Sequence, residues 1–133
     1  MQKYKVLFLG LGRMGFHISA HLSKSKNIEL FIYNRSKKIE NNWLKLYKAK
    51  KFDIKNSLKF KFDIIITCLK DDYSINQVTK NILNSICFHK KTIFIDHSTI
   101  SLSQVEKLNK LLNKNQIEFL DAPVTGGEEG AKN

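Results

Sequence analysis

The stretch KVLFLGLGRMG, residues 5–15, decides the fold of this chain. A lysine and four apolar residues are followed by six residues with glycine at the first, third and sixth positions. Met14, Ile18 and Leu22 then recur at every fourth position, so that they share one face of a helix. The pattern predicts a buried strand, a glycine-rich turn and a helix in direct succession.

Each glycine of this turn has a separate use in a site for a dinucleotide. Gly10 permits the tight turn, Gly12 lets the backbone approach a pyrophosphate, and Gly15 allows close packing of helix on strand. The N–H groups of Arg13 and Met14 then face the anion at the positive end of the helix dipole. The predicted phosphate cradle comprises Gly10, Leu11, Gly12, Arg13, Met14 and Gly15. The alternative is a plain turn that happens to contain three glycines.

The end of the second predicted strand, residues 28–33, indicates which dinucleotide is preferred. An NAD site usually places Asp or Glu there to accept hydrogen bonds from the ribose hydroxyls. This chain instead has Asn34, Arg35 and Ser36, followed by two lysines. The Arg35 guanidinium offers a planar set of donors to a 2′-phosphate, with Ser36 and the lysines in support. We therefore predict NADP rather than NAD; the alternative is that Arg35 is a solvated residue of a helix cap.

Short apolar runs alternate with helical patterns along the rest of the chain. The further predicted strands are residues 62–69, 92–96 and 117–120, and residues 49–61 are read as a loop with at most a short strand. Because such strands are apolar on both faces, they favour a parallel sheet covered by helices on each side. The predicted fold class is α/β, a Rossmann doubly wound parallel sheet with helices on both faces.

Three further helices are predicted from their start signals and apolar spacing. The predicted caps are Ser36, then Asp71 or Asp72, then Ser101 in a capping box with Gln104. The apolar stripes are Ile39, Trp43 and Leu46 or Tyr47 in the first helix, Ile75, Val78 and Ile82 in the second, and Val105, Leu108 and Leu112 in the third. These stripes predict the helical contribution to the core.

The charge balance is strongly basic, with 23 Lys and Arg against 12 Asp and Glu in 133 residues, a formal net charge of +11. This length fits one domain, residues 1–133. All but two of the basic residues are lysines, and they are spread along the chain. Dispersed lysines are typical of a solvated surface with some non-specific attraction to polyanions, so we expect no specific nucleic acid. A basic nucleic-acid-associated protein is the alternative, which the charge alone favours.

Targeting and redox signals indicate a reduced, cytoplasmic protein. The apolar runs, such as residues 64–66, are far shorter than a membrane span, and the first residues lead directly into a strand rather than a secretory leader. Cys68 and Cys87 have no metal or redox spacing and are read as small buried residues. His17 and His21 are four residues apart, but no third ligand is evident beside them, so no metal site is predicted.

Read in order, four segments give the chain a family resemblance. They are the glycine turn, Asn34-Arg35, DHST at residues 96–99 and DAPVTGG at residues 121–127. With these segments the chain resembles the β-hydroxyacid dehydrogenases, which include 3-hydroxyisobutyrate dehydrogenase, tartronate semialdehyde reductase and glyoxylate/succinic semialdehyde reductase. These enzymes are related to 6-phosphogluconate dehydrogenase through its N-terminal NADP-binding domain. The resemblance covers essentially the whole chain.

The resemblance implies two sets of contact residues. On the cofactor, it implies contacts from Arg13, Met14, Asn34, Arg35, Leu69, Ser98 and Thr99. On the substrate, it implies contacts from Ser98, Thr125, Gly126 and Gly127, where hydroxyl and backbone donors hold a carboxylate. Lys70 stands where the family usually has proline, and Thr125 stands where it has serine.

By the same resemblance, the family's catalytic group is a lysine near the start of a second, all-helical domain. That lysine lies beyond Asn133, and Lys132 falls on a variable position, so no catalytic residue is assigned in this chain. We expect an NAD(P)-binding domain that is incomplete at its C-terminal end and lacks the helical domain. The implied parent activity interconverts a small 3-hydroxy acid and its semialdehyde by hydride transfer, weakly or not at all for this chain alone.

The expected partners follow from that activity. They are a small hydroxy acid or semialdehyde, and either a second copy of the chain or a separate chain that supplies the helical domain. No membrane partner is expected. An alternative of another class is a non-catalytic NADP(H)-binding module or sensor, which needs no lysine.

Overall fold

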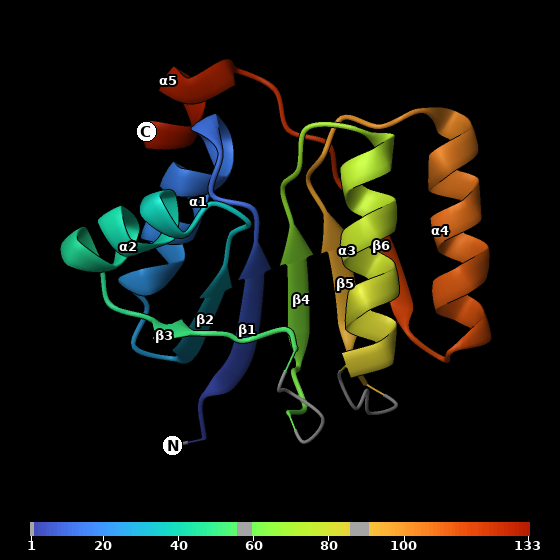
Figure 1. Cartoon of the computed structure of the whole chain (residues 1–133), viewed down its shortest axis with the longest axis horizontal. Helices are drawn as coiled ribbons and strands as arrows, with labels where there is room; N and C mark the ends of the chain where they lie inside the picture. The colour runs from blue at the N-terminus through green and yellow to red at the C-terminus, as the bar shows by residue number, and fades with distance from the viewer. Residues whose placement is uncertain (1, 56–59, 86–90) are drawn as a thin grey trace.

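A parallel β-sheet forms the centre of the molecule in the computed structural model, which describes residues 2–55, 60–85 and 91–133 (Figure 1). Its strands are β1 (Tyr4–Leu9), β2 (Ile28–Tyr33), β3 (Lys50–Lys51), β4 (Ile64–Thr67), β5 (Ile93–Asp96) and β6 (Glu118–Asp121). Within the described ranges the strand order is β3-β2-β1-β4-β5-β6, and every neighbouring pair is parallel. This is the order of a dinucleotide-binding Rossmann fold, so the predicted fold class is confirmed.

Helices cover both faces of this sheet. They are α1 (Arg13–Ser23), α2 (Lys37–Leu46), α3 (Asp72–Ser85), α4 (Leu102–Lys114) and the short α5 (Gly127–Lys132). Figure 1 shows α3 and α4 side by side in front of the sheet, and α5 beside the start of α1. Within the described ranges, no helix is long and apolar enough to cross a membrane.

Successive side chains of the central strands point to opposite faces of the sheet, and this divides the core into two halves. Leu7 and Leu9 of β1 belong to one apolar cluster, which includes Ile82 of α3 and Leu112 of α4. Val6 and Phe8 belong to the other, which includes Trp43 of α2 and receives packing from α1. Because successive side chains of a strand point to opposite faces, a continuously apolar strand requires helices on both sides.

The capping box predicted at α4 forms only in part. The Ser101 hydroxyl oxygen accepts a hydrogen bond from the Gln104 N–H, as predicted. The Gln104 side chain does not return to the Ser101 N–H; that N–H donates to Asp72 of α3, and the Gln104 and Asn76 amides pair with each other. Since α3 already supplies a carboxylate, the local partner is replaced by one from the neighbouring helix.

The apolar stripe predicted for α2 is also only partly correct. Trp43 is fully buried, and its indole N–H donates to the Phe16 carbonyl oxygen of α1 at 3.0 Å. Ile39 and Leu46 are 38% and 66% exposed, whereas Glu40 is 0% exposed. A charged residue therefore takes the inward position that the pattern assigned to its apolar neighbour. Cys68 is half-buried, and Cys87 lies outside the described residues.

Candidate dinucleotide-binding site

Two glycines of the motif at residues 10–15 are required by packing. Gly10 has a φ of +105°, and a β-carbon on it would lie 2.3 Å from the carbonyl oxygen of Cys68. A β-carbon on Gly15 would lie 2.1 Å from the carbonyl oxygen of Gly10. These contacts bring the start of α1 against the ends of β1 and β4, which is the close packing that this motif requires.

Gly12 differs from both, because nothing lies within 4 Å of the position that its β-carbon would take. It is the N-cap residue of α1, and no side chain among the described residues caps the N–H groups that follow it. The first residues of a helix have N–H groups without intrahelical acceptors, and these attract an anion. The open space and the free donors together fit the pyrophosphate of a dinucleotide.

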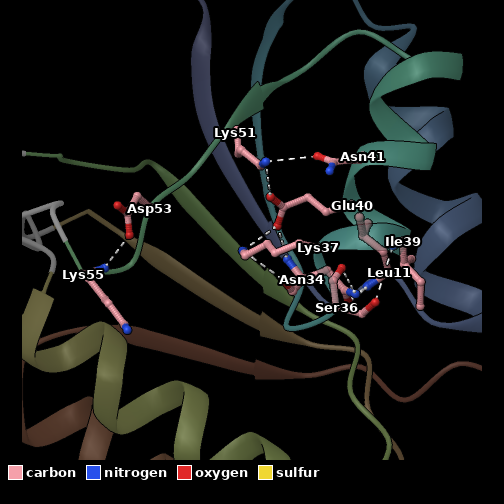
Figure 2. Close-up of polar contacts among 10 residues, drawn as sticks. All are labelled: Leu11, Asn34, Ser36, Lys37, Ile39, Glu40, Asn41, Lys51, Asp53 and Lys55. Atoms are coloured by element: carbon pink, nitrogen blue, oxygen red, sulfur yellow. Dashed lines mark hydrogen bonds and ion pairs between the residues drawn. The ribbon is translucent and has the colours of Figure 1, made fainter.

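Asn34, at the end of β2, ties the second loop of the site to the first (Figure 2). Its side-chain oxygen accepts a hydrogen bond from the Leu11 N–H at 2.9 Å. Its side-chain amide donates to the carbonyl oxygen of Ser36 at 3.1 Å. The Gly10 N–H adds a second tie, to the Tyr33 carbonyl oxygen at 3.0 Å. The glycine turn and the end of β2 therefore behave as one unit.

The three residues after Asn34 differ in their hydrogen bonds. Arg35 is exposed, and within the described residues its guanidinium forms no hydrogen bond or ion pair. The Ser36 side chain accepts a hydrogen bond from the Ile39 N–H and caps α2 as predicted. Lys37 is also exposed, but its ammonium group donates to the Asn34 carbonyl oxygen and to Glu40. The prediction that this lysine supports Arg35 on a phosphate stays a prediction; without a ligand, the Lys37 ammonium group is engaged with Asn34 and Glu40.

The loop after β4 is held from β5. The Leu69 N–H donates to the Ser98 hydroxyl oxygen at 2.8 Å, and Ser98 itself is buried. The Ser98 N–H and the Thr67 hydroxyl both donate to Asp96, at 3.0 and 2.8 Å. Burial raises the pKa of Asp96 above its ordinary value, and these hydrogen bonds oppose that shift. Leu69 and Ser98 thus contact each other, and the cofactor contacts that the resemblance implies for them stay a prediction.

A cleft of about 550 Å³ lies where these loops meet. Six predicted residues line it: Gly10, Gly12, Asn34, Arg35, Ser36 and Leu69. The cleft opens at the carboxyl ends of β1, β2 and β4, at the edge of the sheet where open α/β folds bind ligands.

The α3 wall of the cleft is a feature that sequence reasoning missed. Tyr73, Gln77 and Asn81 line it and follow one another at spacings of four residues. That spacing places them on one helix face, and it was the available signal. Tyr73 is 68% exposed, so its ring borders the open space.

Other predicted residues lie outside the lining of this cleft. Leu11 and Gly15 are buried, Arg13 and Met14 begin α1, and Thr99 is exposed. The set Thr125, Gly126 and Gly127 leads into α5, which packs against α1. Two contacts fix that packing: His17 to Glu128 at 3.2 Å, and His21 to the Ala131 carbonyl oxygen at 2.9 Å. Among the described residues, no group of three or more His, Cys, Asp or Glu side chains could hold a metal ion.

Cys68 lies directly beneath the glycine turn but has no nucleophilic character there. Burial, together with the nearby Asp96 carboxylate, raises the pKa of its thiol to about 11. The thiol is therefore protonated at neutral pH, and its role is to pack against the turn.

The fold and the cleft together define a dinucleotide-binding domain of the Rossmann class. A family model described as the NAD binding domain of 6-phosphogluconate dehydrogenase matches residues 5–133. The chain belongs to this family, which confirms the resemblance drawn from the glycine turn and the three later segments.

Individual relatives align with nearly all of the chain. An uncharacterized oxidoreductase of Shewanella frigidimarina is 35% identical over 132 residues, 97% of this chain and 44% of the relative. Mitochondrial 3-hydroxyisobutyrate dehydrogenase of Drosophila melanogaster is 34% identical over 129 residues, 94% of this chain and 38% of the relative. The solved structure of Mycobacterium tuberculosis 3-hydroxyisobutyrate dehydrogenase with L-serine has a TM-score of 0.83 at 25% identity, covering 98% of this chain and 44% of that one. The chain thus spans less than half the length of these relatives.

Proposed function

We propose that the chain is the NADP-binding domain of an oxidoreductase that interconverts a small 3-hydroxy acid and its semialdehyde by hydride transfer. Family membership supports the nicotinamide dinucleotide, and the 3-hydroxyisobutyrate dehydrogenase named among the relatives supports the substrate class. When bound, the cofactor supplies the hydride, while the protein binds, orients and excludes water.

One observation carries the choice of NADP. The exposed Arg35 guanidinium lines the cleft and forms no hydrogen bond or ion pair within the described residues, and the Asp71 carboxylate attracts it only at longer range. None of residues 34–36 at the end of β2 carries a carboxylate. Glu40, in the first turn of α2, is the first acidic residue after β2, and it is turned inward and fully buried. A free, planar donor and a withdrawn carboxylate favour a ribose that carries a 2′-phosphate.

The adenosine half of the cofactor then occupies the cleft between Arg35 and the Tyr73 face of α3. The pyrophosphate lies over Gly12, where the open space is found. The nicotinamide end extends toward Ser98 and Thr99, and the substrate carboxylate toward residues 125–127. Such a domain would work together with a helical domain, in the cytoplasm.

Isothermal titration of the folded chain with NADPH and with NADH tests the first part of this proposal. We expect saturable binding of NADPH with a lower dissociation constant than that of NADH. Tighter binding of NADH would contradict the choice of NADP. Following NADPH absorbance after adding succinic or tartronate semialdehyde, with and without a full-length relative as positive control, tests the reaction.

A further inference from the structure

Glu40 is a fully buried carboxylate directly behind the turn that carries Arg35. It lies in the first turn of α2, where the sequence pattern had placed apolar Ile39 inward. Glutamate is almost never fully buried unless it is paired, since removing its charge from water is costly. The partners of this carboxylate therefore show which part of the structure it holds.

The two oxygens of the Glu40 carboxylate differ: Oε2 accepts hydrogen bonds, whereas the buried Oε1 has an ion pair and no hydrogen bond among the described residues (Figure 2). Oε2 accepts a hydrogen bond from the Asn34 N–H at 2.8 Å and one from the Lys37 ammonium group at 3.1 Å. Oε1 lies 3.4 Å from the ammonium group of Lys51, on β3. Lys37 also donates to the Asn34 carbonyl oxygen at 3.1 Å. The carboxylate and its lysine thus bind Asn34 through both backbone polar groups.

The side chain of Asn34 extends this network into the phosphate cradle. It accepts a hydrogen bond from the Leu11 N–H and donates one to the Ser36 carbonyl oxygen. A continuous set of contacts therefore runs from Lys51 through Glu40 and Asn34 to the glycine turn, as Figure 2 shows. Arg35 is the residue directly after Asn34, so the backbone that Glu40 holds also aims the guanidinium.

We infer that Glu40 is a positioning residue for the dinucleotide: its carboxylate holds the turn of residues 34–36 in the conformation that aims Arg35 at the 2′-phosphate and keeps the Leu11 amide in place. This inference rests on the proposed function. It adds a residue that never touches the cofactor, and it explains why a charge is buried at this point. Preorganised binding groups lose less freedom when the ligand binds, so affinity depends on such supports.

A purely structural role of Glu40 would give different experimental results from a positioning role. If Glu40 only braced α2 against β3, its loss would change the stability of the chain and leave the affinity of each folded molecule unchanged. A positioning role changes affinity, and changes it more for NADPH than for NADH, because only NADPH uses the aim of Arg35.

Two substitutions separate these roles. Glu40→Leu keeps the volume and removes both oxygens. The two lysines left behind, Lys37 and Lys51, are 55% and 47% exposed, so water can solvate their charges and the variant is expected to fold. Glu40→Gln keeps an acceptor for the Asn34 N–H and should restore most of the affinity. Glu106→Gln, at an exposed position of α4, controls for the loss of one negative charge. Thermal unfolding, the dissociation constants of NADPH and NADH, and amide exchange without cofactor are measured for each variant.

We expect Glu40→Leu to raise the dissociation constant of NADPH about tenfold and that of NADH less, since one charge-assisted hydrogen bond is lost at the turn. The amides of Asn34 and Leu11 should exchange faster, whereas Glu40→Gln and Glu106→Gln should stay near wild type. Unchanged constants and unchanged exchange in a folded Glu40→Leu variant would overturn the inference and leave the proposed function intact. Failure of the wild-type chain to bind either coenzyme would overturn both.

Lys51→Met provides an independent arm, because Lys51 contacts Glu40 but does not line the cleft. Without this ammonium group, less positive charge balances the buried Glu40 carboxylate near the 2′-phosphate. We expect NADPH to bind more weakly and NADH to be nearly unaffected. An equal loss for both coenzymes would contradict the positioning role.

Discussion

The carbonyl oxygen of Cys68 lies 2.3 Å from the position that a β-carbon on Gly10 would take. Cys68, the residue that follows β4, thus leaves no space for a side chain at Gly10. Gly12, two residues further along the same turn, faces open space instead. The glycines of one motif therefore serve different purposes, and substitution should separate them.

Gly10→Ala should destabilise the chain, because the residue has a positive φ and its new methyl group meets backbone. A strained residue of this kind costs of order 1–3 kcal/mol, and the clash adds to that cost. Gly12→Ala should leave the free energy of unfolding within about 0.5 kcal/mol of wild type. It should weaken NADPH binding more than about tenfold, since the methyl group occupies the space of the pyrophosphate. Urea unfolding and calorimetric titration measure both; tight binding by Gly12→Ala would contradict the placement of the phosphates.

Arg35→Ala should weaken NADPH binding by about ten- to a hundredfold, because hydrogen bonds to a charged group contribute about 1.5–3 kcal/mol. NADH lacks the 2′-phosphate, so its dissociation constant should change little. Arg35→Lys keeps the charge without the planar pair of donors. Its dissociation constant for NADPH should therefore fall between those of the wild type and Arg35→Ala. Competitive fluorescence titration measures the ratio of constants; an equal loss for both coenzymes would argue against contact with the 2′-phosphate.

Ser98→Ala should loosen the loop after β4, since the Leu69 N–H loses its acceptor. A buried donor left without a partner costs about 1–3 kcal/mol. Ser98→Thr keeps the hydroxyl and serves as the control. Amide exchange of Leu69, together with urea unfolding, reports the change; normal protection of Leu69 in Ser98→Ala would show that another group holds the loop.

The contact between Asp72 and Ser101 should make stability depend on pH in the acid range. Both Asp72 oxygens accept hydrogen bonds from Ser101, which holds the pKa of this carboxyl below its ordinary value of 3.8. A lowered folded-state pKa means that ionised Asp72 stabilises the chain above the ordinary value, and this contribution is lost as the pH falls through the folded value. Asp72→Asn should therefore flatten the curve of unfolding free energy against pH below about pH 4. An unaltered curve would assign the acid sensitivity to other carboxyls.

Much of the fold could be predicted because its signals are local. The glycine turn, the spacing of Ile75, Val78 and Ile82, and the cap at Ser36 each depend on residues a few positions apart, and the structure confirms them. The partners of Gln104 and the burial of Glu40 could not be predicted in this way. Both depend on groups brought from other elements, Asn76 from α3 and Lys51 from β3.

In the candidate site too, the features that depend on local sequence could be predicted and those that depend on other elements could not. The cradle and Arg35 follow from a contiguous motif and the end of one strand, and the cleft brings Gly10 and Gly12 of the cradle together with Arg35. The α3 wall with Tyr73 depends on how that helix lies over the sheet, which the apolar stripe alone did not reveal. The residues near Thr125 stay a prediction, since their role requires a substrate to test it.

The central claim is that the amides at the start of α1 hold the diphosphate of a nicotinamide coenzyme. Titration of the ¹⁵N-labelled chain with NADPH, followed by amide chemical shifts, tests it most directly. The account predicts saturable shifts that are largest for Gly12, Arg13 and Met14, with Arg35 also affected and the α4 amides unchanged. A folded chain whose Gly12–Met14 amides do not move at saturating NADPH or NADH would contradict it.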